Sequence, residues 1–296
     1  MDMQIITDND EILLSDHDIH VKDFIVSSIS LLPDYSQIEG RSGQVDHGAT
    51  FGTRTIRVPF YIDNYDNHDF ALLRDKLFDL VIKRKSFYIR EMRRLKRKQY
   101  AFVDIDESPK QETGTENLYV GGKRYLVRIS NEFDIEQMFS YGEGELEFET
   151  TELPFAESIG TSMDIERNGI RYNDELWSYG MGLSHNEEEW KYEHNGGSFR
   201  IYNAGIDVHP FEQDLKITIE GASKNYELKN TTTGDTFKYT GDTTGTIVLN
   251  GANITMNSLQ AFRDTNKQYI TLARGWNQFT QNQKRKVQID TRFYYL

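Results

Sequence analysis

The second half of this chain is divided into short apolar runs by turn-forming residues. From residue 163 onward, asparagine and glycine turns recur between these runs, at 168–169, 195–197, 203–205, 234–235 and 250–251. Many short strands with a turn every ~8–12 residues are typical of a β-sandwich or barrel. The predicted strands are Phe199–Tyr202, Leu215–Ile219, Tyr226–Leu228, Thr246–Leu249, Tyr269–Leu272 and Val287–Tyr295.

The first half combines strands with a single convincing helix. Apolar residues alternate at 19–21 and 56–62, which predicts strands, and recur at helical spacing from Phe70 to Val81. Asp66 or Asn67 can cap that helix. Further strands are predicted at 87–89, 100–103 and 123–135, so the pattern is helix, strand, turn, strand. The glycine-rich stretch 40–52 has no apolar period and predicts a loop.

The chain is long enough for two domains. It has 296 residues, against a usual ~100–200 per domain. Residues 152–163 contain proline, glycine and small polar residues, which indicates a linker. We therefore predict a mainly β protein. An α+β, sandwich-like N-terminal domain with one helix and a β-hairpin spans 1–155, and a C-terminal β-sandwich spans 156–296.

Charge is distributed unevenly over the first half. Residues 1–152 hold 19 basic and 29 acidic residues, a net of −10, although 83–98 has nine basic residues and one acid. The other residues of that half therefore include 10 basic and 28 acidic residues, a net charge of −18. The basic residues are Lys83, Arg84, Lys85, Arg90, Arg93, Arg94, Lys96, Arg97 and Lys98.

This basic strip has three interpretations. It is a solvated charge run, a nucleic-acid contact, or a contact with the acidic body of a neighbouring copy. Complementary patches steer association and set its register, and contacts of this head-to-tail kind close into rings. The protein–protein interpretation is favoured, because nucleic-acid binding requires exposed aromatics between the cations, whereas Phe87 and Tyr88 are consecutive.

Three other groups of residues resemble binding or catalytic sites. Glutamates at 143, 145, 147 and 149 share one strand face, but catalytic carboxylates need divided roles in a cleft. An exposed or edge strand explains them better. The cluster at 16–20 contains metal-ligand residue types without a distant third ligand group, so no metal site is expected. Trp177, Trp190 and Trp276 are candidates for sugar stacking, with burial as the competing interpretation.

Several function classes lack their residues. There is no cysteine, and neither a phosphate-binding glycine loop nor a nucleophile elbow occurs. No stretch reaches the ~20 apolar residues of a membrane span, and no secretion signal is evident at the start. A net charge of −13 disfavours general nucleic-acid binding. We expect no catalysis, no cofactor and no membrane contact.

Four motifs in the second half occur in the order of a known family. They are 199–205 (FRIYNAG), 215–221 (LKITIEG), 230–237 (NTTTGDTF) and 272–279 (LARGWNQF). The order resembles the galectin-like C-terminal domain of distal tail proteins of long, non-contractile-tailed phages (siphophages). Arg274 stands where proline is common in the family, and Ala204 precedes the glycine of the first motif. The first half is similar less sharply, at 52–60 and in the helix–strand segment. The whole most resembles the versions from temperate staphylococcal phages.

The resemblance implies a structural protein of the virion. Such proteins form a hexameric ring at the tail tip, a baseplate hub assembled in the host cytoplasm. The ring joins the tail tube to the tail-associated lysin or spike and to receptor-binding proteins, and DNA can pass through it without sequence-specific contact. The alternative is a glycan-binding host-adhesion module, and a glycosidase is a third and weaker hypothesis.

Overall fold

The computed structural model describes residues 1–8, 10–63, 69–95, 118–138, 141–170, 176–177, 180–184 and 186–296, with the backbone alone at 93–95 and 118–120. The chain forms two compact units. The first comprises 1–30, 53–121 and 126–151, and the second comprises 31–52, 122–125 and 152–296. Among the described residues no helix has the length and apolar character that crossing a membrane requires. The predicted boundary at 155/156 stays a prediction.

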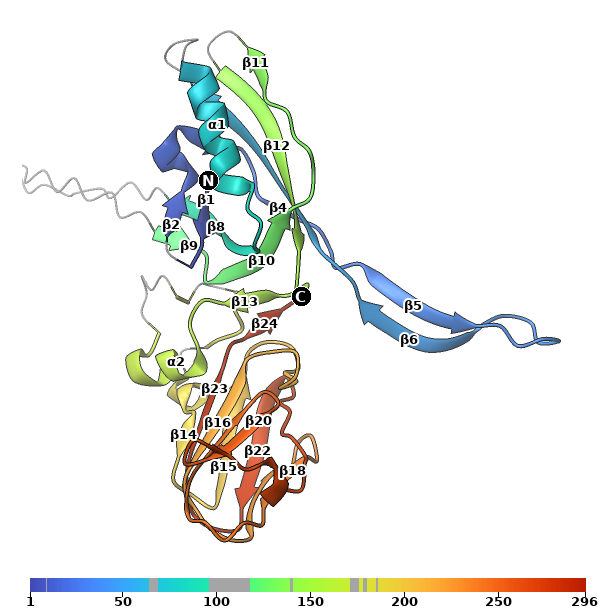
Figure 1. Cartoon of the computed structure of the whole chain (residues 1–296), viewed down its shortest axis with the longest axis vertical. Helices are drawn as coiled ribbons and strands as arrows, with labels where there is room; N and C mark the ends of the chain where they lie inside the picture. Colours follow the sequence, from blue (N-terminus) through green and yellow to red (C-terminus); the bar gives the residue numbers. More distant parts are fainter. Residues whose placement is uncertain are drawn as a thin grey trace, which may run out of the picture. The chain divides into compact units, whose positions relative to one another are not determined.

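The first unit is built on an antiparallel sheet whose central path is β2-β1-β8-β10-β12-β7-β3 (Figure 1). Short strands add to β7, β8 and β12 at its margins. Its strands are β1 (Asp2–Ile6), β2 (Glu11–Leu13), β3 (Ile19–Val21), β4 (Ile25–Val26), β7 (Thr55–Asp63), β8 (Phe87–Leu95), β9 (Leu118–Val120), β10 (Lys123–Ile129), β11 (Glu136–Met138) and β12 (Tyr141–Thr150). A 3₁₀ turn, η1 (Leu14–His17), and the helix α1 (Asp69–Val81) complete the unit.

The predicted helix is confirmed as α1, and its apolar period explains its packing. Phe70, Leu77 and Val81 are buried, one helical turn or two apart. They join a core formed by alternate residues of the strands, among them Phe60 and Phe148, both fully buried. The predicted caps Asp66 and Asn67, the predicted strand 100–103 and the hairpin it would close lie outside the described residues.

The second unit contains a β-sandwich, as predicted. One sheet has the order β14-β23-β16-β19-β20-β21 and the other β15-β22-β17-β18. The strands are β14 (Glu193–His194), β15 (Ser198–Asn203), β16 (Leu215–Ala222), β17 (Tyr226–Asn230), β18 (Thr236–Tyr239), β19 (Gly245–Asn250), β20 (Asn253–Met256), β21 (Leu259–Gln260), β22 (Gly275–Gln281) and β23 (Lys286–Thr291). Alternate residues of both sheets are buried, which forms the core between them. The mainly β class predicted from the turn spacing is confirmed.

Shorter elements complete this unit. They are β13 (Ala156–Ser158), the helix α2 (Ser162–Asn168), β24 (Tyr294–Tyr295) and the 3₁₀ turns η2 (Glu187–Trp190) and η3 (Phe262–Asp264). The predicted linker 152–163 is thus ordered: β13 pairs with β24, and Phe155 is 7% exposed. The proline and small residues of 152–163 interrupt the apolar period of the sequence, but they do not make this segment a flexible linker.

Two predictions in the second half are wrong. Residues 269–272 form no strand, because their backbone makes only an isolated bridge between Leu272 and Val208. The predicted strand 287–295 is interrupted at 292–293 into β23 and β24. The alternation ends there as well, since Phe293, Tyr294 and Tyr295 are all buried.

The prediction of a loop at 40–52 is also wrong. β5 (Leu31–Ser36) and β6 (Val45–Phe51) pair antiparallel and form a long two-stranded hairpin, called the arm below (residues 31–51). Figure 1 shows the arm as a long two-stranded ribbon. Every residue of β5 and nearly every residue of β6 is exposed, so burial has imposed no apolar period on β6 for a sequence pattern to display.

Candidate assembly surface

The arm has one apolar face. Residues paired across two strands point to the same side, and Leu31 pairs with Phe51 and Pro33 with Ala49. Tyr35 follows on that side of β5 by the period of two, and beyond a register shift it pairs with Asp46. The opposite side is mainly polar, as its Ser36–His47 hydrogen bond of 2.7 Å shows. We call Leu31, Pro33, Tyr35, Ala49 and Phe51 the apolar face of the arm.

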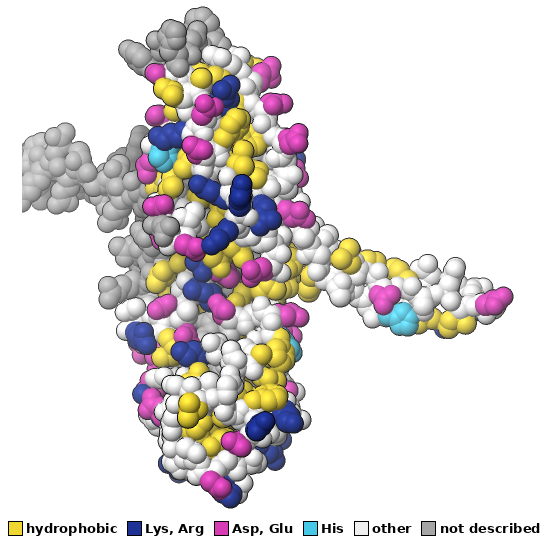
Figure 2. All heavy atoms as spheres, in the orientation of Figure 1, with side chains coloured by type: hydrophobic (Ala, Val, Ile, Leu, Met, Phe, Trp, Pro, Cys, Tyr) yellow, Lys and Arg dark blue, Asp and Glu magenta, His cyan; other side chains and the backbone are white. Residues whose placement is uncertain are grey.

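This apolar face is uncovered. Leu31 is 60% exposed, Tyr35 52% and Phe51 49%. Within the described part of the chain, β5 and β6 pair with each other and with no further strand. Figure 2 shows hydrophobic side chains along the arm. An isolated two-stranded hairpin is at best marginally stable, and exposed apolar strands of this kind mark interaction sites.

The arm ends in a tight turn. The amide of Arg41 donates to the carbonyl of Ile38, and Gly40 has φ of +78°, a left-handed conformation that glycine adopts without strain. Ile38, 51% exposed, therefore lies at the tip. The glycines that suggested a loop serve this reversal of the chain.

A groove lies at the base of the arm within the second unit. Its volume is about 630 Å³, and Phe51 of the arm forms part of its wall. Phe51 packs edge-on against Phe155, with ring centroids 5.4 Å apart. The other lining residues are Ile206, Asp207, Val208, His209, Glu212, Gln213, Thr233, Thr271, Leu272, Ala273, Arg274 and Leu296. The apolar face of the arm is therefore continuous with an apolar groove.

One wall of the groove is fixed by a hydrogen-bonded carboxylate. Asp235 accepts from the hydroxyl of Thr233 at 2.7 Å and from the amide of Thr271 at 2.9 Å. Burial by itself would raise the pKa of Asp235, but the hydrogen bonds from Thr271 and Thr233 outweigh it and hold that pKa below its usual value. The charged carboxylate thus ties the turn after β17 to the segment before β22.

Buried side-chain amides in this unit explain several residues of the motifs noted above. Asn277 is fully buried: its side chain accepts from the amide of Ala273 at 2.9 Å and donates to that residue's carbonyl at 2.7 Å. Asn230, also fully buried, donates to Asn277 at 3.0 Å. Gly205 leaves space for Tyr294, since a Cβ there would overlap the backbone N and O of Tyr294. These motif residues stabilise loops of the second unit.

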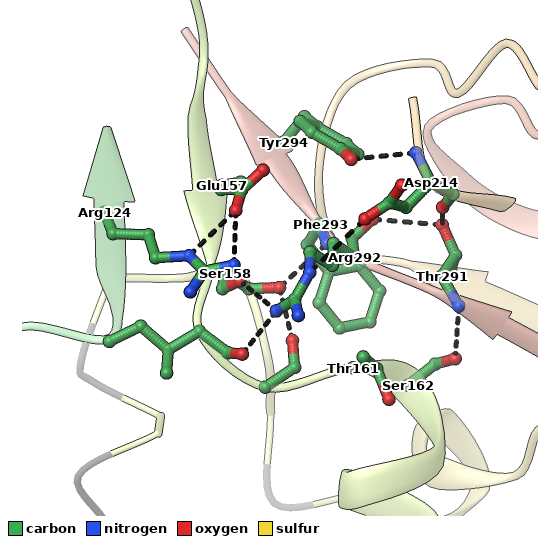
Figure 3. Close-up of polar contacts among 12 residues, drawn as sticks. Arg124, Glu157, Ser158, Thr161, Ser162, Asp214, Thr291, Arg292, Phe293 and Tyr294 are labelled. Carbon is green, nitrogen blue, oxygen red and sulfur yellow. Dashed lines mark hydrogen bonds and ion pairs between the residues drawn. The ribbon is translucent and has the colours of Figure 1, made fainter. Parts of the chain in front are cut away.

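A polar network attaches the last strand to the rest of the second unit (Figure 3). Arg292 donates to the carbonyls of Ser158 and Ile159, and its Nε lies 3.5 Å from Asp214. Arg124 forms a largely buried ion pair with Glu157 at 2.7 Å. Ser162 donates to the carbonyl of Ile289 at 2.8 Å. The contacts drawn in Figure 3 connect β13 and α2 to the C-terminal strands of the second unit.

The predicted basic strip divides in the structure. Lys83, Arg84 and Lys85 are exposed after the end of α1, whereas Arg90 is 5% exposed and donates to Gln4 at 3.2 Å and to the carbonyl of Gly121. Arg93 and Arg94 lie on β8 opposite Val120 and Tyr119, and only their backbone is described. Lys96, Arg97 and Lys98 lie outside the described residues. As an interface, the strip stays a prediction.

The glutamate face lies on β12, which pairs with β10 on one side and β7 on the other. β12 is therefore a central strand, so the prediction of an edge strand is wrong. The prediction that the glutamates lie on a solvent-facing side of the strand agrees with the exposure of Glu145 and Glu149. Glu149 is paired with Arg128 across the sheet and Glu147 with Arg57, while Glu143 forms an ion pair with Lys22 at 2.7 Å. Basic neighbours offset the repulsion between the glutamates, and the carboxylates lie on an open sheet face.

The remaining candidates have structural contacts among the described residues. No group of three or more metal-ligand side chains is found among the described residues. In the cluster at 16–20, burial and then the nearby Lys76 lower the pKa of His17, and His20 stacks on Tyr61. Trp177 is 5% exposed, so it offers no stacking surface, and the Trp190 indole donates to the carbonyl of Ser184 at 3.0 Å. The Trp276 ring is covered by Arg200 at 4.2 Å.

Residues 12–150 match the model of the phage tail protein RIFT-related domain family. This region includes α1, the whole arm and the strands of the first unit from β3 to β12, while β1 lies outside it. The chain contains a phage tail protein domain. Its predicted membership of the siphophage distal tail proteins is confirmed at the level of family and fold, while the narrower likeness to staphylococcal phages stays a prediction.

Solved structures extend the comparison over the whole tail protein. It superposes on the Dit (gp 19.1) protein of phage SPP1, described as a paradigm of the hub adsorption apparatus in phages that infect Gram-positive hosts. The TM-score is 0.61 with 13% identity, over 98% of this chain and 99% of that one. At that identity the likeness establishes the fold.

More distant matches come from the phage p2 baseplate in its activated conformation. The strontium form gives a TM-score of 0.39 with 8% identity, over 98% of this chain and 97% of that one. The calcium form gives 0.38 with 9% identity, over 99% and 97%. These scores are too low to define a shared fold. No curated protein sequence is significantly similar to the tail protein.

Sequence reasoning missed the arm and its groove. The signal available was the series Leu31, Pro33, Tyr35, which alternates with period two, but the glycines downstream suggested that no second strand followed. The groove brings together residues from positions 51, 155, 206–213 and 271–274, and no local pattern joins them.

Proposed function

We propose that this protein is a structural, non-enzymatic hub of the phage tail tip that associates with copies of itself into a closed ring. The observation that carries the proposal is the uncovered apolar face of the arm. Leu31 and Tyr35 are more than half exposed on a hairpin whose strands, in the described part of the chain, have no third strand beside them. Such a face is stable in water only when another surface covers it.

The family and the fold support the tail-tip role. Residues 12–150 are a phage tail domain, and the whole chain has the fold of a Dit protein described as a hub. From the family resemblance we propose six copies in the ring. The proposed partners are the tail tube, the tail-associated lysin or spike and the receptor-binding proteins. The location is the virion tail tip, after assembly in the host cytoplasm.

Charge supplies a second contact in this proposal. Lys83, Arg84 and Lys85 are exposed, and the first 152 residues outside the strip carry a net charge of −18. We propose that the basic strip of one copy faces the acidic body of the next. This electrostatic contact affects the orientation and the rate of association of the copies more than their affinity.

Electron microscopy of the purified full-length chain tests the proposal. We expect closed rings of uniform diameter, with six-fold symmetry in class averages. Particles that stay monomeric at every concentration, together with absence of the protein from purified tail tips, would overturn it.

A further inference from the structure

We propose that Asn195 is a site of spontaneous deamidation, a chemical modification that places a new carboxylate in the connection between β14 and β15 (Figure 1). The inference concerns the second unit alone and does not depend on the proposed ring. The sequence contains three Asn-Gly pairs, at 168–169, 195–196 and 250–251. Glycine hinders the reaction at its amide least, because it has no Cβ. All three asparagines are exposed, so exposure does not distinguish them.

The reaction needs only water and a free backbone amide. The deprotonated amide nitrogen of the glycine attacks Cγ of the asparagine side chain, a C–N bond forms, and ammonia leaves as the ring closes to a succinimide. Water then opens the ring at either of its two carbonyls. One product is aspartate, and the other is isoaspartate, in which the main chain runs through the former side chain. The net change is amide plus water to carboxylate plus ammonium, with no oxidation or reduction.

Two of the three pairs are protected by their backbone. Gly169 follows the end of α2, and its amide donates to the carbonyl of Ile165 at 2.7 Å, so its nitrogen is not available to attack. Asn250 lies at the end of β19, where it pairs with Lys216 on one side and Asn253 on the other. Ring closure requires rotation about the Cα–C bond of the asparagine, and strands paired on both sides oppose that rotation.

The pair at 195–196 lacks both protections. It lies between β14, which belongs to the six-stranded sheet, and β15, which belongs to the four-stranded sheet. Within the part of the chain that the structure describes, neither the Gly196 amide nor the Asn195 side chain makes a hydrogen bond. Asn195 is outside both strands, so the rotation that ring closure requires breaks no strand pairing. The fold therefore makes this pair the most reactive of the three.

The two products differ in their effect on the sandwich. The carbonyl of Gly196 accepts a hydrogen bond from the side-chain amide of Gln281, which also donates to the carbonyl of Arg285 at 2.9 Å. The side-chain oxygen of Gln281 accepts from the buried hydroxyl of Tyr226 at 2.8 Å. Aspartate leaves the main chain unchanged. Isoaspartate lengthens the main chain by one methylene and displaces the Gly196 carbonyl from Gln281, so it is the product that loosens this network.

Isotope labelling of the purified full-length chain tests the inference. The folded chain is incubated at mildly alkaline pH in water enriched in heavy oxygen, then digested with trypsin in ordinary water and analysed by mass spectrometry. A succinimide hydrolysed during the incubation takes up heavy oxygen, whereas deamidation during digestion does not. The tryptic peptide 192–200 contains Asn195 and no other asparagine. The same chain unfolded in urea shows how fast the three pairs react without the fold.

We expect Asn195 in the folded chain to take up label at least about tenfold faster than Asn168 or Asn250, and the three rates to converge in urea. Gly196→Ala is the matched variant. Its Cβ would lie 3.4 Å from the carbonyl oxygen of Ser198, an ordinary contact, so the alanine fits the turn while its methyl group slows ring closure.

Three results would overturn the inference. They are equal labelling of the three pairs in the folded chain, no label at Asn195 when the unfolded chain is labelled, and an unchanged rate in Gly196→Ala. None of these results bears on the proposed ring, which is tested separately by electron microscopy.

Discussion

The arm and the β17–β18 hairpin are both antiparallel strand pairs with one apolar side, yet their surroundings are opposite. In the sandwich, Tyr226, Leu228, Phe237 and Tyr239 are each at most 1% exposed, because a second sheet covers them. On the arm, Leu31 and Tyr35 are 60% and 52% exposed. The same pattern of pairing therefore stabilises the fold in one region, and in the other it presents a surface that the rest of this chain leaves uncovered.

The largest expected effect separates these two roles by stability. Phe279→Ala removes a fully buried ring from the sandwich core and should lower the free energy of unfolding by about 3–5 kcal/mol. Leu32→Ala, at a position 58% exposed on the arm, should change it by less than about 0.5 kcal/mol. Urea denaturation at a concentration where the chain is monomeric measures both. Equal losses would show that the arm is part of the core.

A second variant tests whether buried amides hold the sandwich loops. Asn277→Ala leaves the amide and carbonyl of Ala273 without their side-chain partners, which should cost about 2–3 kcal/mol of unfolding free energy. Gln278→Ala, on the outward side of the same strand, is the matched control and should be near neutral. The same denaturation experiment compares them, and an Asn277→Ala chain as stable as the control would remove this explanation of the motif.

Charge reversal tests the basic strip. Changing Lys83, Arg84 and Lys85 together to glutamate should weaken self-association by on the order of tenfold at low salt, about 1.4 kcal/mol. Sedimentation at several ionic strengths measures this, and the difference from wild type should shrink as salt increases. An unchanged association constant at low salt would assign the strip to the solvated surface.

The smallest effect is a pH dependence confined to the sandwich. The lowered pKa of Asp235 means that its contribution to stability is present above the unfolded value of about 3.9 and is lost as pH falls through the lower folded pKa. Asp235→Asn should flatten the stability–pH curve in that acidic range. Thermal unfolding of both proteins from pH 5 to pH 2 is the measurement, and parallel curves would contradict the hydrogen-bonded carboxylate.

The sequence predicts those features in which burial imposes a period. The helix α1 shows it through Phe70, Leu77 and Val81, and β15, β16 and β19 show it through alternate buried residues. Sequence-based prediction fails at β6, where exposure on both sides leaves no period. It also fails at 269–272, where Leu272 lines the groove and makes only an isolated bridge to Val208. The groove depends on contacts between distant segments, which no local spacing encodes.

Local sequence patterns were equally insufficient for the basic strip and for the glutamates of β12, whose roles depend on neighbours distant in sequence. The basic residues at 83–98 are adjacent in sequence, but Arg90 points inward to Gln4 while Lys83 to Lys85 face solvent. The alternating glutamates of β12 suggested an edge strand, because the sequence does not show which strands pair with β12. Register with Arg57 and Arg128 supplied the missing explanation.

The central claim is that the apolar face of the arm is covered by another copy of the chain. Sedimentation velocity of the wild type against Leu31→Asn/Tyr35→Asn, over a range of concentrations, tests it directly. We predict a ring-sized species for the wild type and a folded monomer, with unchanged circular dichroism, for the double variant. A double variant that assembles with the wild-type constant would contradict the claim.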